Sequence, residues 1–224
     1  LGVYTAYVSH FGPFALPPVK TIVHPKTTPS PCLKLTTQLT DTKSAPTAAQ
    51  FKNIKHTYSA PPAMSIDTKK IYCAGINTNR GLIVIELDPS QAPNTVNNFV
   101  YLAQHQFYDG LKFHRVVSNF IIQSGDPLGN GTGGPGYKFN DEPVQGDYTE
   151  GCLAMANSGP NTNGSQIFIC TKDDTKALKK SYNLFGHVVQ GLDVAQKIQG
   201  PGDTQSTKNI TPDVINHVIV VAAP

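Results

Sequence analysis

The stretch FHRVVSNFIIQSGD, residues 113–126, contains the pattern that decides the fold. Two short apolar runs flank a polar turn, which is typical of two antiparallel strands joined by a tight connection. Side chains of a strand alternate between its faces, so pairing Arg115 opposite Ile121 would place Arg115, Ile121 and Gln123 on one face. The stretch therefore predicts a cation, an apolar wall and an amide side by side. Phe120 falls on the opposite face unless the chain twists or bulges there.

Similar apolar runs on both sides of this hairpin predict a mainly β fold. IYCAGINT (71–78) and LIVIELD (82–88) flank a polar turn and form a second hairpin. With LKFHRVV, FIIQS, CLAMA, QIFICT, LFGHVV and DVINHVIVV they give eight strands, enough to close a barrel. Helical spacing of apolar residues predicts helices within QAPNTVNNFVYLAQ (91–104) and GLDVAQKIQ (191–199). We therefore expect a closed eight-stranded antiparallel β-barrel capped by two α-helices.

The composition changes along the chain and suggests three parts. Residues 1–24 begin with a β-prone stretch without Asp, Glu, Lys or Arg up to residue 19, which predicts an extended N-terminal arm. Residues 25–63 are rich in Thr, Pro and Lys and poor in large apolar residues, so we expect a linker that cannot fold by itself. Residues 64–224 form the barrel domain.

Charge and cysteine spacing limit the classes of partner. The formal net charge is only +3, too small for the positive surface that a nucleic-acid backbone demands. No run of 18 apolar residues is present, so we expect no membrane span. Cys32, Cys73, Cys152 and Cys170 show no CxxC or Cys/His spacing, which argues against a structural zinc site. We expect buried free thiols, with a Cys73–Cys152 disulfide as the alternative.

A second block, MANSGPNTNGSQIFICT at 155–171, stands out beside the first. Together with APNTVNNF of the predicted helix, NGTGG at 130–134 and the late FG of LFGHV, these blocks resemble the cyclophilin family of peptidyl-prolyl cis-trans isomerases. The resemblance runs from about Lys69 to Val221. It implies an enzyme that rotates X-Pro bonds in proline-containing polypeptides, assists protein folding and needs no metal or cofactor.

The resemblance implies Arg115, Phe120 and Gln123 as catalytic residues. The barrier to rotation is about 18–20 kcal/mol because rotation breaks amide resonance, and millisecond turnover requires removing roughly 5–7 kcal/mol of it. As the amide twists, its nitrogen regains a lone pair, so a donor aimed at it binds the twisted state better than either planar state. Arginine suits this role because it is always protonated and presents several fixed donors.

The same resemblance implies a substrate-binding set around these residues. An apolar pocket receives the proline ring, polar side chains hold the substrate backbone, and one aromatic ring borders the pocket. The implied substrate-binding residues are Ile121, Asn157, Gln166, Phe168, Leu178 and Tyr182. Ala177 stands where many members carry tryptophan or phenylalanine. We therefore expect weaker binding of the cyclic peptide inhibitor typical of the family.

The alternative function is a non-catalytic peptide-binding or structural role, with the barrel as a module and the arm joining subunits. A β-prone arm without charge can add to an exposed sheet edge of a neighbour, so we expect a homo-oligomer or larger assembly through residues 1–24. The chain begins at Leu1, has a Thr/Pro-rich spacer and has no basic tail. These features favour an exported or surface-tethered protein over a cytosolic one.

Overall fold

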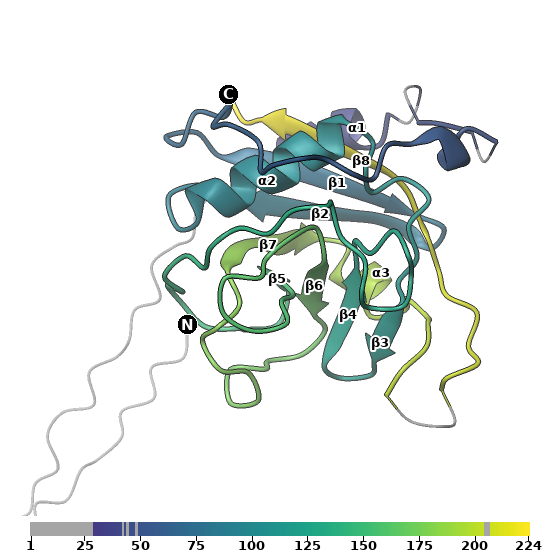
Figure 1. Ribbon diagram of the computed structural model, residues 1–224. Coiled ribbons are helices and arrows are strands. Elements are labelled where there is room, and N and C mark those ends of the chain that lie inside the picture. Colours follow the sequence, from purple (N-terminus) through teal and green to yellow (C-terminus); the bar gives the residue numbers. More distant parts are fainter. Residues whose placement is uncertain (1–28, 42, 44, 48, 204–206) are drawn as a thin grey trace, which may run out of the picture.

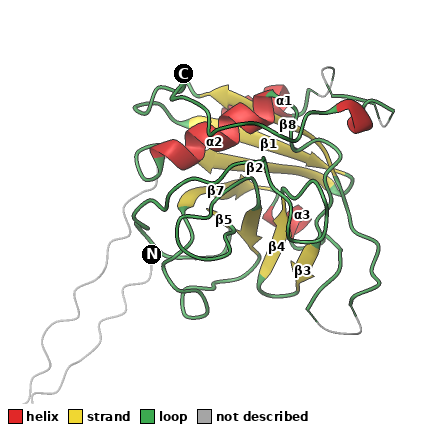
Figure 2. Ribbon diagram, in the orientation of Figure 1, coloured by secondary structure: helices red, strands yellow, loops and turns green. Residues whose placement is uncertain are grey.

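The computed structural model describes residues 29–224 apart from residues 42, 44, 48 and 204–206. The predicted N-terminal arm, residues 1–24, and the intersubunit contacts expected of it lie outside these described residues. Strands and loops make up most of the described chain, with one helix of three turns (Figure 2). No helix in the described part is long and apolar enough to cross a membrane.

Eight strands form a single antiparallel sheet, which confirms the prediction of a mainly β fold. They are β1 (Tyr72–Thr78), β2 (Gly81–Leu87), β3 (Arg115–Val117), β4 (Ile121–Ser124), β5 (Cys152–Met155), β6 (Ile167–Cys170), β7 (Leu184–Gln190) and β8 (Ile215–Ala222). Their order is β3-β4-β6-β5-β7-β2-β1-β8. Figure 1 shows the sheet curled into a half-barrel. The described strands include no β3–β8 ladder; an isolated bridge joins Lys112 and Val214 instead.

Both predicted hairpins and the longer predicted helix are present. β1 and β2 pair along their whole lengths, with Thr78 opposite Gly81 at the turn. Helix α2 (Pro93–Gln104) begins with proline in its first turn, where the missing N–H costs nothing. The Glu142 carboxylate caps it, accepting the backbone N–H groups of Asn94 and Thr95 at 3.0 and 2.8 Å. The second helix, α3 (Leu192–Ala195), is shorter than the predicted range.

The main core fills the concave side of the curled sheet. Val96 and Phe99 of α2 pack there with Ile85 and Phe185 of the strands, and all four side chains are fully buried. A second cluster, around Ile121 and Phe168, lies beneath the site described below. Burial of apolar side chains is the main stabilising term of a small domain, so the half-barrel supplies a rigid support for the side chains on its surface.

The described part of the segment expected as a linker lies against the half-barrel. We call its described residues, within 29–63, the N-terminal extension. It contains two 3₁₀ turns, η1 (Pro31–Leu35) and η2 (Phe51–Asn53), and helix α1 (Thr36–Leu39). Leu39 is fully buried over β1, where Gly75 leaves room: a Cβ on that glycine would stand 2.6 Å from the Leu39 carbonyl oxygen. The extension therefore buries apolar surface against the outside of β1, although it has few large apolar residues of its own.

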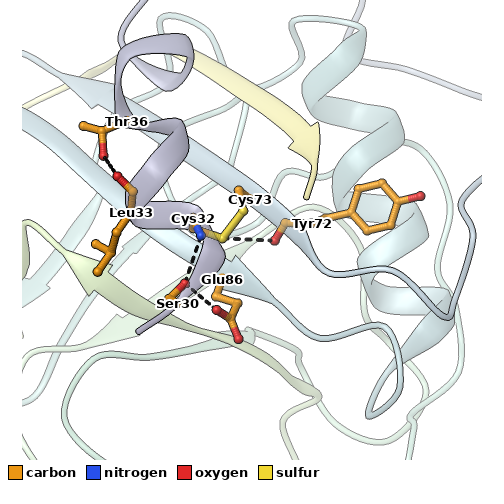
Figure 3. Close-up of a disulfide and its surroundings, with 7 residues drawn as sticks. All are labelled: Ser30, Cys32, Leu33, Thr36, Tyr72, Cys73 and Glu86. Carbon is orange, nitrogen blue, oxygen red and sulfur yellow. Dashed lines mark hydrogen bonds between the residues drawn. A yellow bond between two sulfur atoms is a disulfide. The ribbon is translucent and has the colours of Figure 1, made fainter. Parts of the chain in front are cut away.

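All four cysteines form disulfides, so the expectation of free thiols and the alternative Cys73–Cys152 pairing are both wrong. Cys32 of η1 is bonded to Cys73 of β1, and Cys152 of β5 is bonded to Cys170 of β6. Figure 3 shows the first bond beside Ser30, whose hydroxyl accepts the Cys32 N–H at 3.2 Å and donates to Glu86. Pairing depends on strand register and on the extension's path, neither of which cysteine spacing reveals.

Candidate functional site

The β3–β4 hairpin carries the predicted cation, apolar wall and amide on one face. Arg115 lies opposite Gln123, and Val117 lies opposite Ile121. The predicted pairing of Arg115 with Ile121 was wrong by two residues. An even shift preserves the alternation of faces, so Arg115, Ile121 and Gln123 still share one side of the sheet.

Two neighbours hold the Arg115 side chain. Its Nε and Nη2 atoms donate to the two carboxylate oxygens of Asp203 at 2.8 and 2.6 Å, a bidentate ion pair. Its Cζ atom lies 5.9 Å from the centre of the Phe120 ring, so Phe120 reaches the arginine from the turn before β4. The hydrogen bonds from Arg115 lower the pKa of Asp203. Arg115 is one-third exposed and so remains accessible from solvent.

Beside the arginine lies the apolar cluster that the family resemblance implied as a proline pocket. Ile121 and Phe168 are buried at its base, and Phe120, Leu178 and Tyr182 pack against them while partly exposed. The Phe168 and Tyr182 rings meet edge to face, with centroids 5.5 Å apart. The arrangement offers aromatic and branched apolar walls at the surface, which suit an apolar ring.

Leu178 owes its place to the loop that follows β6. Its backbone N–H donates to the carbonyl oxygen of Asp174 at 2.9 Å, and so does that of Ala177. Burial raises the pKa of the Asp174 carboxyl group to about 6, and the nearby charge of Asp173 adds to this effect. Ala177, which the family resemblance matched to an aromatic position, is exposed. The pocket therefore lacks a bulky side chain there.

The predicted polar residues line a groove next to the apolar cluster. Gln123, Asn157 and Gln166 all face this groove of about 810 Å³, whose other wall is the loop 131–138. The Gln123 Nε2 donates to the Gln166 Oε1 at 2.9 Å. Asn157 donates to the carbonyl oxygen of Ser181 at 2.8 Å. Side-chain and backbone polar groups thus line this groove.

The groove and the apolar cluster form one continuous surface. Ala156 belongs to both, and Gln123 of the groove pairs with Phe168 of the cluster across β4 and β6. All nine residues named from the sequence therefore lie in one neighbourhood. Among the described residues, no group of three or more His, Cys, Asp or Glu side chains is placed to hold a metal ion. The groups present can bind and polarise a peptide through hydrogen bonds and apolar contact.

Two features of this neighbourhood were missed by the sequence reasoning. The first is Asp203, 88 residues from its arginine partner, in a stretch without any strand or helix pattern. The second is support from the N-terminal extension. The Tyr58 N–H donates to the Pro135 carbonyl oxygen at 2.8 Å, and a Cβ on Gly136 would stand 2.7 Å from the Tyr58 carbonyl oxygen. The extension therefore holds the loop that forms one wall of the groove.

Comparison with known proteins places this neighbourhood inside a matched region. The family model described as cyclophilin type peptidyl-prolyl cis-trans isomerase/CLD matches residues 73–220. Peptidyl-prolyl cis-trans isomerase B of Streptomyces anulatus is 46% identical over 167 residues, covering 66% of this chain and 95% of the relative. A crystal structure of a cyclophilin type peptidyl-prolyl cis-trans isomerase of Cryptosporidium parvum superposes with a TM-score of 0.62 at 33% identity, covering 69% of this chain and 99% of that chain. A structure of the same parasite protein in the presence of the dipeptide Ala-Pro gives a TM-score of 0.60 at 33% identity, covering 66% and 98%.

Proposed function

The chain belongs to the family of cyclophilin-type peptidyl-prolyl cis-trans isomerases, and from that premise we propose that it isomerises X-Pro bonds at the groove beside Arg115. The single observation that carries this proposal is the placement of an arginine next to an apolar cluster and an amide-lined groove. Arg115, Phe120 and Gln123 act on the rotating bond. Ile121, Asn157, Gln166, Phe168, Leu178 and Tyr182 bind the substrate.

Each part of the site has a physical task in this reaction. The proline ring leaves water for the apolar cluster of Phe120, Ile121 and Phe168, which anchors one side of the bond. Gln123 and Asn157 hold the backbone on the other side by hydrogen bonds, so that rotation occurs about the X-Pro bond alone. The Nη1 group of Arg115, which Asp203 does not use, donates to the amide as it twists. A donor that binds the twisted amide more strongly than the planar one lowers the barrier.

A protease-coupled assay with a proline tetrapeptide tests this assignment. We expect Arg115→Ala to lower turnover by about 10²–10³-fold, the usual cost of removing one preorganised donor. Arg115→Lys should lose most turnover while peptide binding is retained, because lysine keeps the charge without the fixed fork of donors. Arg80→Lys is the matched control, since Arg80 also pairs with an aspartate, Asp213, but lines no part of the groove. Full turnover in Arg115→Ala would refute the proposed site.

We further propose that the curled sheet closes into a complete barrel next to this site. Three backbone hydrogen bonds flank the Lys112–Val214 bridge: Gly110 N–H to Ile215 O, Ile215 N–H to Leu111 O, and Phe113 N–H to Asp213 O, at 2.7–2.9 Å. They support the segment that leads into β3. Amide hydrogen exchange at residues 113 and 215 as slow as in β1 would agree with closure, and fast exchange there would contradict it.

The two disulfides support an exported location for the protein. Disulfides persist in oxidising compartments and are rare where thiols are kept reduced. We therefore propose that the chain works outside the cytoplasm. Fractionation of the producing cells, with alkylation of free thiols before lysis, checks this. Recovery of the protein in the cytoplasm with four alkylated cysteines would rule it out.

A further inference from the structure

Asp203 stands beside Arg115 because the backbone of the three residues before it is held against β3. The turn Gly200-Pro201-Gly202-Asp203, which we call the GPGD turn, runs along the edge of β3. The Val116 N–H donates to the Pro201 carbonyl oxygen at 2.7 Å. Each flanking glycine leaves the room that this contact needs. A Cβ on Gly200 would collide with the carbonyl oxygen of Phe113, and one on Gly202 would stand 2.7 Å from that of Val116.

The pair that results restricts the arginine more than an ordinary surface ion pair does. Asp203 takes both Nε and Nη2 of Arg115, the side-on bidentate form. In the lysine–aspartate pairs Lys180–Asp147 and Lys197–Asp193, a single ammonium nitrogen meets the carboxylate, at 3.0 and 2.9 Å, and cannot form a bidentate fork. Asp203 is about half exposed, so solvent screens the attraction and the pair adds little to folding stability. Its main physical consequence is the fixed orientation of the guanidinium.

We propose that Asp203 is a positioning residue of the isomerase site, which holds the guanidinium of Arg115 side-on so that its Nη1 edge remains free to donate to the rotating amide. This rests on the proposed role of Arg115. A long arginine side chain loses rotamer freedom when it acts, and a partner that fixes it beforehand removes that cost from each turnover. Asp203 thus acts through Arg115 and does not touch the substrate.

The test is a set of turnover measurements on the full chain with the same tetrapeptide. Asp203→Ala should lower kcat about tenfold, because the donor is then misplaced in most encounters, and leave KM within about twofold, since ground-state contacts remain. Asp203→Glu should recover part of the loss. In an Arg115→Ala background the Asp203→Ala change should have no further effect. Asp193→Ala, which removes another exposed ion pair, is the control and should leave kcat unchanged.

The outcomes separate this inference from the proposed site. If Arg115→Ala abolishes turnover but Asp203→Ala leaves kcat unchanged or raises it, the positioning role is overturned and the site stands. An increase would mean that Asp203 restrains the arginine from its substrate. An equal loss from Asp203→Ala with and without Arg115 also overturns the inference, because the aspartate would then act by another route. If Arg115→Ala keeps full turnover, the site itself is wrong.

Discussion

The N-terminal extension and the GPGD turn both pack against the half-barrel at glycine residues. The extension buries the residues it contacts, whereas the GPGD turn leaves its ion pair with Arg115 partly exposed to solvent. The extension covers the surface: Leu39 lies over Gly75, and a Cβ on Gly110 would stand 2.8 Å from the Phe51 ring. Cys32 and Leu39 become fully buried with Cys73 and Val84 of the barrel. The GPGD turn leaves Asp203 and Arg115 accessible to solvent.

Close packing at glycine residues therefore has a different physical consequence in each region. Buried apolar contacts add to the free energy of unfolding, so the part of the extension around Cys32 and Leu39, away from the groove loop that Tyr58 holds, should act mainly on stability. An exposed, screened ion pair adds little stability, but it can fix a catalytic donor, so the GPGD turn should act mainly on turnover. The division is sharp enough to be tested by changing each region and measuring both quantities.

The largest expected effect on stability comes from the disulfide that fastens the extension. Replacing Cys32 and Cys73 by alanine frees a loop of 41 residues, and the chain-entropy model gives a loss of about 4 kcal/mol in the free energy of unfolding. The turnover at a temperature where the variant is folded should stay close to that of the wild type. Urea unfolding and the coupled isomerase assay measure the two quantities.

The second disulfide provides the contrasting variant. Cys152 and Cys170, separated by 18 residues, lie in the cluster that contains Ile121 and Phe168. Replacing both by alanine should cost about 3 kcal/mol by the same model and should lower turnover as well, since the base of the pocket loses support. If the Cys32/Cys73 variant instead lost turnover to the same degree, the extension would belong to the catalytic machinery and the proposed division would fail.

A smaller effect is expected where the extension meets β1. Gly75→Ala would press a methyl group against the Leu39 backbone, which cannot move aside as a flexible side chain could. We expect a loss of about 1–3 kcal/mol, as in other overpacked sites, measured by urea unfolding. Gly134→Ala is the matched control, because nothing lies within 4 Å of its Cβ position, and it should change stability by about 0.5 kcal/mol or less. Equal effects of the two substitutions would mean that the extension does not rest on Gly75.

The hairpin and most of the site were predictable because their signals are local. Alternation within residues 113–126 gave the shared face of Arg115, Ile121 and Gln123, and an error of two residues in register left that result intact. The cation, the amide and the apolar wall are all encoded within a dozen positions. Resemblance to a family then supplied Asn157, Gln166 and the pocket residues, which no local pattern would have connected.

The extension and Asp203 were not predictable in the same way. Counting large apolar residues suggested a linker at 25–63, but the buried surface is shared with the barrel at Gly75 and Cys73 and does not appear in the segment's own composition. Asp203 follows two glycines in a stretch that looks like any polar loop. Its role depends on a contact with a strand almost 90 positions earlier, which the fold of the chain creates and no local pattern reveals.

The smallest expected effect is on the stability contributed by Asp203. It tests whether the GPGD turn adds little to the free energy of unfolding. Hydrogen bonds from Arg115 lower the folded-state pKa of Asp203, so the pair stabilises the fold above the unfolded-state pKa of about 4. That contribution is lost as the pH falls through the folded-state value. Because solvent screens the pair, Asp203→Asn should reduce the free energy of unfolding at pH 7 by no more than about 1 kcal/mol. The difference from the wild type should shrink in urea titrations as the pH falls below the folded-state pKa of Asp203. A loss at pH 7 as large as that of the Cys32/Cys73 variant would make the ion pair a structural element, and the two regions would no longer differ in kind.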